Sequence, residues 1–257
     1  MKYWSESHTA IAQAVMQGKI ENALKILHEH GYKIKKTDPC ISTGNNKVGA
    51  TINFSLPAVF GCTTECHKTC AKAFLENGDA TECYAVKDYR YLNVVYARFL
   101  NMYYAMKEQE TLKAYIIATI EKELKKRENK RSKNYKKPLF VRLHESGDFF
   151  NVSYLDLWLE IAKHFPQVTF YTYSKAFRVL EQRINSIPAN LHILLSEWEG
   201  LTIPASVSES YNHATVSDKA VIGYIECPAT GSKADTMTCE KCGYLCARLV
   251  NIRFNPH

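Results

Sequence analysis

Cysteine is the residue type in this chain whose number and spacing most clearly point to chemistry. Eight of the nine cysteines fall into two clusters, and Cys40 stands apart. The clusters are Cys62, Cys66, Cys70, Cys83 and Cys227, Cys239, Cys242, Cys246. Four thiolates suit a tetrahedral zinc ion or an iron–sulfur cluster, and spacing alone does not choose between the two. The sequence therefore predicts two sites that each hold a metal ion or a cluster.

The second cluster contains a Cys-x2-Cys pair, Cys239 and Cys242. On a tight turn such a pair places two thiolates on one metal ion, and Gly243 lets the backbone turn beneath it. Pro228 and the polar segment 230–238 argue against four free buried thiols. We expect the segment 227–257 to bind zinc or an iron–sulfur cluster.

The first cluster has three intervals, x3, x3 and x12, between its cysteines. This spacing resembles the Cys-x3-Cys-x2-Cys triad of radical S-adenosylmethionine enzymes, in which a [4Fe–4S] cluster keeps one iron open for the cofactor. The last short interval is x3 here instead of x2, so the pattern favours a cluster without establishing that enzyme class. His67 is an alternative ligand or an exposed loop histidine.

The middle of the chain has the pattern of a sheet that can position these residues. We expect strands over 51–56, 138–143, 168–173, 191–195 and 220–225. Helical patterns with Leu155, Trp158, Leu159 and with 177–187 lie between them, and Asn151 or Ser153 can cap the first. Alternating strands and helices predict parallel pairing with right-handed crossovers. The expected fold is α/β, a partial (β/α) barrel or an open parallel sheet.

Helices precede this core. Apolar spacing predicts an amphipathic helix over 5–30, with Gly31 as its C-terminal cap, and two long helices over 84–127. The chain then divides into an N-terminal helical segment, 1–36, an α/β core with the first cysteine cluster, 37–226, and a C-terminal four-cysteine segment, 227–257. Its 257 residues suit this organisation.

Polar residues follow the expected strands, where parallel α/β sheets bind ligands. Strand alternation predicts that His144 shares a face with Arg142, which makes His144 a candidate proton donor or substrate contact, or a hydrogen-bonded structural histidine. Lys175 and Glu197 end the next two strands and are candidates to line the same opening, with surface salt bridges as the alternative. Trp198 is positioned either to stack on a planar substrate or to pack.

The net charge of +7, from 33 basic and 26 acidic residues, is concentrated in one stretch. Residues 121–137 contain nine Lys or Arg and three Glu, so this stretch is either a solvated helix end or a phosphate-binding surface. A 46% hydrophobic composition excludes general disorder. Apolar runs long enough to span a membrane and signal-peptide features are lacking, so we expect a cytoplasmic protein without membrane partners.

Several motifs occur in an order that resembles the phage gene product eighty-eight domain family. They are STGNNK (42–47), FSLPAVFGC (54–62), ECYA (82–85), VRLHESGDFF (141–150), FYTYSKA (170–176), LLSEWEG (194–200), ECPATG (226–231) and CEKCGYLC (239–246). The resemblance implies Cys62, Cys83 and the four C-terminal cysteines as ligands and leaves Cys66 and Cys70 ambiguous. It places the chain in phages or mobile elements, in the host cytoplasm.

Members of this family look distantly similar to radical S-adenosylmethionine proteins. By that analogy Ser146, Gly147 and Asp148 occupy the place of a Gly-Gly-Glu segment that meets the cofactor's amino group. Gly147 would permit close backbone approach and Asp148 would accept from an ammonium. Alternatively, Ser146 or Asp148 caps the following helix.

Three functions compete at this point. The first is a phage iron–sulfur protein, a radical S-adenosylmethionine-like enzyme with an unknown substrate. The second is a zinc-stabilised nucleic-acid-binding protein that uses 121–137 and stacks bases on Tyr84, Tyr89 and Tyr91. The third is an anti-defence protein that targets a host protein.

Overall fold

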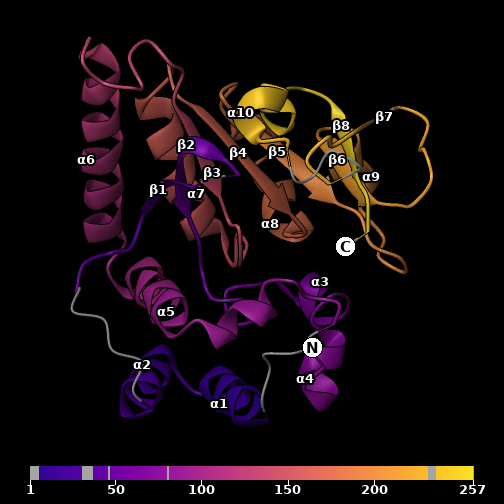
Figure 1. Cartoon of the computed structure of the whole chain (residues 1–257). Helices are drawn as coiled ribbons and strands as arrows, with labels where there is room; N and C mark the ends of the chain where they lie inside the picture. The colour runs from indigo at the N-terminus through magenta and orange to yellow at the C-terminus, as the bar shows by residue number, and fades with distance from the viewer. Residues whose placement is uncertain (1–5, 31–36, 46, 80, 231–235, 257) are drawn as a thin grey trace.

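The fold is described from a computed structural model, which covers residues 6–30, 37–45, 47–79, 81–230 and 236–256. Its centre is an eight-stranded sheet with the order β1-β2-β3-β4-β5-β6-β8-β7 (Figure 1). The strands are β1 Ser42–Asn45, β2 Gly49–Phe54, β3 Phe140–Leu143, β4 Thr169–Ser174, β5 Leu191–Ser196, β6 Asn212–Val216, β7 Tyr224–Glu226 and β8 Asn251–Phe254. Since β1 and β7 form the two edges, the sheet is open and does not close into a barrel.

Every strand pair except β1–β2 is parallel, which confirms the expected parallel α/β core. The register aligns Asn53, Arg142, Tyr171 and His192 in one row across β2, β3, β4 and β5. Paired residues share a face of the sheet, and the next residue of each strand faces the other side. The fold therefore has two distinct faces, one of which carries this polar row.

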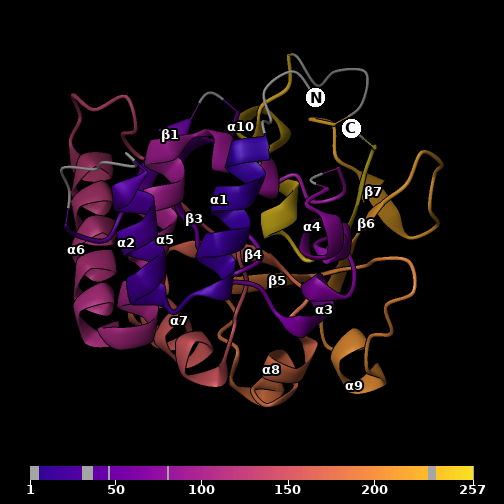
Figure 2. The same cartoon turned by 90° about the horizontal axis from the view of Figure 1, so that it is seen from below.

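Helices surround the sheet. The longer ones are α1 Glu6–Gln17, α2 Ile20–Glu29, α5 Leu92–Lys107, α6 Gln109–Glu128 and α7 Val152–His164. The shorter ones are α3 Thr64–His67, α4 Lys72–Asn77, α8 Phe177–Glu181, α9 Ala205–Ser208 and α10 Cys239–Cys242, with single turns η1 Val86–Arg90, η2 Ile184–Ser186 and η3 Leu245–Ala247. Figure 2 shows α1 and α2 side by side, and α2 also packs on α5. These three helices form a layer below the sheet in the view of Figure 1.

The main core lies between α7 and one face of the sheet. Trp158 is buried and meets the ring of Phe54 edge-on, with 5.3 Å between the ring centroids. Burying such an aromatic side chain stabilises the fold by about 2–3 kcal/mol. The side chain of Asn151 accepts from the backbone N–H of Tyr154 at 2.8 Å, so the predicted cap of this helix is confirmed.

The other face of the sheet is covered by the C-terminal segment. A small buried cluster joins Leu194 of β5 and Ile252 of β8 to Cys227. Near the start of β3, the ring of Phe140 stacks on that of Tyr244 with 4.0 Å between centroids. The segment that contains the second cysteine cluster is thus part of the fold and lies against the polar face.

Some elements differ from the sequence-based expectation. The helix expected over 5–30 is two helices, because Lys19 is extended, with ψ 159°, after Gly18. The strand expected over 220–225 shrinks to β7, and three short strands, β1, β6 and β8, were not predicted because none alternates over more than a few residues. The predicted cap Gly31 lies outside the described residues.

Candidate functional site

The first cysteine cluster is held at the carboxyl edge of the sheet by two backbone hydrogen bonds. The N–H of Leu56, just after β2, donates to the carbonyl of Ser146 at 2.9 Å, and the N–H of Asp148 donates to that of Gly61 at 2.7 Å. Both bonds join the chain after β2 to the chain after β3. The cysteine loop therefore lies where parallel α/β sheets bind ligands.

The four thiols of this cluster come together in space. Cys66 contacts Cys62 and Cys70, and Cys70 also contacts Cys83. These contacts lower the pKa of Cys70 and raise that of Cys66, so they favour one thiolate shared among neighbouring thiols. Cys66 and Cys70, which the family resemblance left ambiguous, both belong to the group.

A positive charge stands beside these thiols. Lys175, directly after β4, is within electrostatic reach of Cys62, Cys66 and Cys70. Burial opposes its charge, but the sulfurs and Asp148 outweigh burial and raise the pKa of Lys175. Its Nζ also lies 5.3 Å from the centroid of the Trp198 ring. Trp198 therefore packs beside Lys175, one of the two alternatives that the sequence left for this residue.

Asp148 is fully engaged inside the protein. Its Oδ1 accepts from the N–H of Phe149 and from the hydroxyl of Ser174, and its Oδ2 accepts from the N–H of Lys175, each at 2.7 Å. Asp148 therefore ties the loop after β3 to the loop after β4 and does not cap α7, where Asn151 serves instead.

Gly147 and Ser146 complete this loop. Gly147 has φ +83°, and a Cβ there would lie 2.5 Å from Cβ of Leu56. Only glycine fits both the backbone conformation and the close approach. Ser146 is buried, and its Oγ lacks a hydrogen-bond partner within the part of the chain described here.

The prediction that His144 shares a face with Arg142 is wrong. His144 has φ +59°, which turns its side chain to the α7 side, where Nε2 lies 3.0 Å from the Tyr154 hydroxyl and Nδ1 3.5 Å from Thr172 Oγ1. Burial lowers the pKa of His144 to about 3, so it is neutral. Strand alternation stops at Leu143, because the left-handed residue ends the strand.

Glu197 is likewise held by neighbours. Its Oε1 accepts from the Tyr224 hydroxyl at 2.6 Å and lies 2.9 Å from Nδ1 of His213. The partners of Glu197 are therefore a tyrosine and a histidine, whereas the alternative given from the sequence was a surface salt bridge. His67 is also engaged, with Nε2 2.8 Å from the Val59 carbonyl.

Sequence analysis did not predict the row of polar residues that runs across β2, β3, β4 and β5 on the face covered by the C-terminal segment. Asn53 Nδ2, Arg142 Nε and His192 Nδ1 are buried, and none has a hydrogen-bond partner among the described residues. Unpaired buried polar atoms are uncommon in native proteins, and three in one row mark a face that can receive polar groups. The available signal was Arg142, a charge inside the apolar strand PLFVRL.

Arg142 lies between the two cysteine clusters. Its Nη1 is 3.3 Å from Oε1 of Glu145, whose carbonyl accepts from the hydroxyl of Tyr84, the residue next to Cys83. On its other side Arg142 is within electrostatic reach of Cys239 and Cys246. Tyr84 is 59% exposed, so its ring is open to solvent while its hydroxyl points inward.

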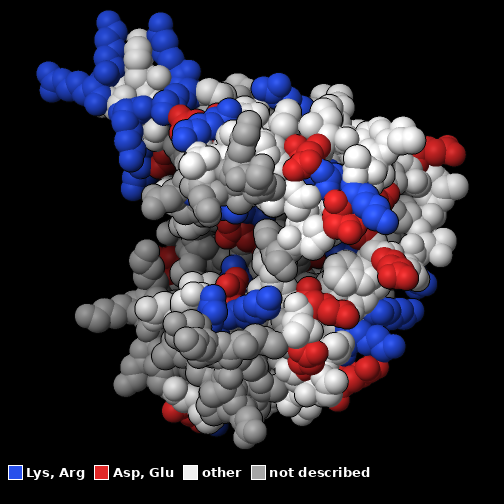
Figure 3. All heavy atoms as spheres, turned by 45° about the vertical axis from the view of Figure 1, so that its right-hand side comes forward, with Lys and Arg blue, Asp and Glu red and all other residues white. Residues whose placement is uncertain are grey.

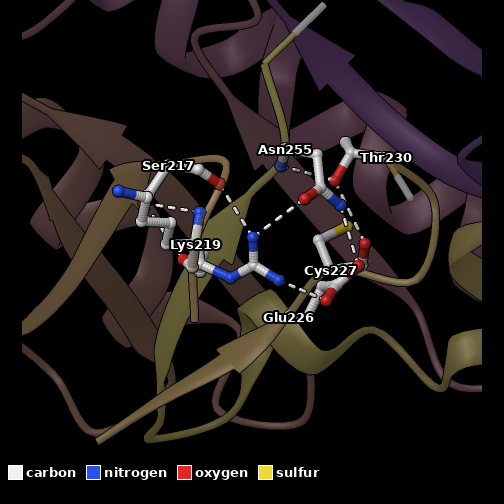
Figure 4. A network of polar contacts seen from close by, with 7 residues as sticks. Ser217, Lys219, Glu226, Cys227, Thr230 and Asn255 are labelled. Atoms are coloured by element: carbon white, nitrogen blue, oxygen red, sulfur yellow. Dashed lines mark hydrogen bonds and ion pairs between the residues drawn. The ribbon is translucent and has the colours of Figure 1, made fainter. Parts of the chain in front are cut away.

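The second cluster is anchored to β8 by a buried arginine (Figure 4). Arg253 pairs with Glu226, donates from Nη1 to the Ser217 carbonyl at 2.8 Å, and contacts Asn255 Oδ1 at the same distance. The N–H of Cys227 donates to the Arg253 carbonyl at 2.8 Å. The position of Cys227 is therefore fixed by the sheet.

The remaining cysteines of this cluster lie on and after α10. Thr238 caps α10 through the N–H of Lys241, and Gly243 ends it with φ +69°, as the Cys-x2-Cys turn required. Cys227, Cys239 and Cys246 interact electrostatically with one another, and Cys242 does so with Cys227 and Cys239. Burial raises the pKa of the Cys246 thiol, which also contacts Tyr173.

Neither cluster is a finished coordination sphere. In the ranges that the structure describes, no group of three or more Cys, His, Asp or Glu side chains is placed to hold a metal ion. The donor chemistry fits all the same, because four soft thiols gather in each cluster and each group has a cation nearby, Lys175 in one and Arg142 in the other. The fold therefore brings the thiols of each cluster near one another.

The three tyrosines expected to stack on bases differ in position. Tyr84 and Tyr91 are exposed, but Tyr89 is buried and donates its hydroxyl to the Ala58 carbonyl at 3.1 Å, so a stacking role for Tyr89 is wrong. All three lie near η1, below the sheet, whereas the basic stretch lies at the other end of α6 (Figure 1).

A comparison with protein-family models matched residues 26–247 to the family described as Gene product 88. The chain belongs to the gene product 88 family of phage proteins. The match covers most of the chain, both cysteine clusters and the whole sheet except β8. Comparison with curated proteins gave no match, and comparison with solved structures gave none either. No helix in the described part of this family member is long and apolar enough to cross a membrane.

Proposed function

We propose that this gene product 88 family member is an iron–sulfur protein of the radical S-adenosylmethionine-like type, with its substrate still to be found. The observation that supports it is the gathering of Cys62, Cys66, Cys70 and Cys83 at the carboxyl edge of the sheet, beside Lys175. Ligands of parallel α/β sheets bind at that edge. Three of these cysteines would bind a [4Fe–4S] cluster, which when bound supplies one electron for reductive cleavage of S-adenosylmethionine.

The chain's own residues would orient and shield the ligand. Gly147 has no side chain where the loop after β3 packs on Leu56, so it lets the cysteine loop lie close against the loop after β3. Lys175 keeps a positive charge next to the thiolates and so offsets their repulsion. The ring of Trp198 lies beside the Lys175 ammonium, where a cation–π contact favours its charged form.

Asp148 would act mainly by positioning. Its carboxylate accepts three hydrogen bonds from the chain and sets the position of the Lys175 backbone. Its proposed contact with a cofactor ammonium would have to use a remaining lone pair. His144 and Glu197, proposed from sequence as catalytic groups, have their polar atoms in contacts with Tyr154, Tyr224 and His213. We therefore place them behind the site.

The second cluster suits a different purpose. Cys227 is fixed to β8, and α10 lies on the inner face of the sheet, so binding of a zinc ion by Cys227, Cys239, Cys242 and Cys246 would hold the C-terminal segment to the core. A second iron–sulfur cluster is the other occupant that four thiolates accept. Elemental analysis of the protein and of Cys242→Ser separates the two.

The enzyme proposal is tested by the fate of S-adenosylmethionine. Anaerobic protein, reconstituted with iron and sulfide and reduced with dithionite, should release 5′-deoxyadenosine and methionine. Cys83→Ala should lose this activity, whereas Cys40→Ala, whose thiol lies outside both clusters, should keep it. Protein that contains its cluster and leaves S-adenosylmethionine intact would contradict the proposal.

A further inference from the structure

The strongest concentration of charge in the molecule lies where α6 ends and the chain leads to β3. Figure 3 shows Lys and Arg side chains projecting together from one corner of the surface. Eight basic residues of this region are exposed: Lys122, Lys125, Lys126, Lys130, Arg131, Lys133, Lys136 and Lys137. The exposed acidic residues in the same stretch are Glu121 and Glu128. The region, called the basic corner below, is therefore strongly positive.

Most of these cations are left unpaired by the fold. The third acid of the stretch, Glu123, is buried and pairs with Lys126 and with Arg127, which is buried as well. Lys137 pairs with Glu240 of α10. The ion pairs between described residues involve none of the other six exposed cations. The helix dipole favours cations in the last turn of α6, but it does not account for Lys130, Arg131 and Lys133, which lie beyond the end of that helix.

Hydrogen bonds hold the loop of the basic corner in place. The N–H of Lys136 donates to the Arg127 carbonyl at 2.9 Å and closes the loop back onto α6. Within it the N–H of Ser132 donates to the Asn129 carbonyl at 2.9 Å, and the side chain of Asn134 is buried. A loop held in this way presents its cations with less ordering on binding than a flexible tail would need.

The exposed side chains of the basic corner suit one class of partner better than others. Among the described residues, no large hydrophobic side chain between Tyr115 and Val216 is exposed. A membrane surface site would need apolar anchors, and a stable protein interface would need an apolar centre. A purely electrostatic surface fits the phosphate backbone of a nucleic acid, which is bound through lysine and arginine without base contacts.

We propose that the basic corner, residues 122–137, is a nucleic-acid-binding surface that grips the phosphate backbone without sequence preference. The corner lies at the amino edge of the sheet, next to α10, whereas Cys62 and its neighbours lie at the carboxyl edge (Figure 1). Binding at the basic corner is independent of iron binding, because residues 122–137 include none of the cysteines.

The test measures binding of a fluorescent DNA duplex, and of its single strand, to the full chain at increasing salt. The triple variant Lys130→Gln, Arg131→Gln and Lys133→Gln removes three exposed charges from the corner. The matched control, Lys25→Gln, Lys163→Gln and Lys219→Gln, removes three exposed charges elsewhere. Equal melting temperatures establish that both variants fold.

The parent should bind with an affinity that falls steeply with salt, with a log–log slope of about −5 for six phosphate contacts. The corner variant should bind more weakly, with a slope smaller in magnitude by about 3, and the control should keep the parent slope. Absence of binding at low salt, equal losses in the two variants, or binding to phosphatidylserine vesicles but to neither DNA would overturn the proposal.

Discussion

His144, Asp148 and Glu197 are polar residues that follow strands of a parallel sheet, and each is held by other side chains or by the backbone. Their polar atoms meet Tyr154, Ser174 and Tyr224, among others. Residues in these places are good candidates for contact with a ligand, yet here their polar atoms contact other parts of the protein. Lys175, whose cation faces the thiols, is the exception.

Replacement of Asp148 tests this positioning role. Asp148→Ala leaves three buried donors without an acceptor and should lower the free energy of unfolding by about 3 kcal/mol. Urea denaturation measures the change. The control Asp218→Ala, at an exposed aspartate, should stay within about 0.5 kcal/mol of the parent. Equal stability of the two variants would show that the hydrogen bonds of Asp148 do not hold the loops after β3 and β4 together.

His144 predicts a pH dependence. Burial lowers its pKa from 6.5 to about 3, so between these values the unfolded chain binds a proton that the folded chain does not. The free energy of unfolding should therefore fall as pH is lowered through this window, by up to about 1.4 kcal/mol per pH unit from this group.

The variant His144→Asn isolates that effect, because asparagine tolerates φ +59° and does not titrate. Its unfolding free energy should depend less steeply on pH between 6.5 and about 3 than that of the parent. His28→Asn, at an exposed histidine, should leave the slope unchanged. A parent slope retained in His144→Asn would contradict the assignment.

At the scale of elements, the loops after β2 and β3 depend on one another. Gly147→Ala places a Cβ 2.5 Å from Cβ of Leu56 at φ +83°, whereas Gly200→Ala, at φ +74°, meets nothing within 4 Å. The second variant should cost about 1 kcal/mol of stability from backbone strain. The first should cost at least about 2 kcal/mol more, since the loops must separate. Thermal or urea unfolding measures both, and similar costs would refute close packing of the loops.

The sequence predicted the longer elements well because they bury one regular face. The strands β3, β4 and β5 and the helix α7 follow the expected periods, and Asn151 caps α7. The short strands β6 and β8 were missed because their pairing depends on neighbours distant in the chain. The turn at His144 was missed because one left-handed residue reverses the side of the sheet on which a side chain lies.

The site was predicted in part for similar reasons. The sequence predicted that Cys62, Cys66, Cys70 and Cys83 belong to one cluster, and their thiols contact one another in the structure. The row through Asn53, Arg142 and His192 comes from strand register, which no single segment encodes. Long-range pairing therefore accounts for most of what sequence reasoning did not find.

Across the whole molecule, the charged and thiol-rich parts occupy separate places. One thiol group lies at the carboxyl edge, the other in the C-terminal segment that contains α10, and Arg142 lies between them. The basic corner lies at the opposite edge from the first group (Figure 1). The proposed nucleic-acid surface and the proposed iron–sulfur site therefore lie at opposite edges of the sheet.

The most direct measurement is the iron and acid-labile sulfide content of protein purified without oxygen, together with its visible spectrum. The parent and Cys40→Ala should be brown and contain iron and sulfide in equal amounts, as a [4Fe–4S] cluster requires. Cys83→Ala should lose both, because it removes a thiol from the group at the carboxyl edge. A colourless parent that contains zinc and no iron would contradict the account.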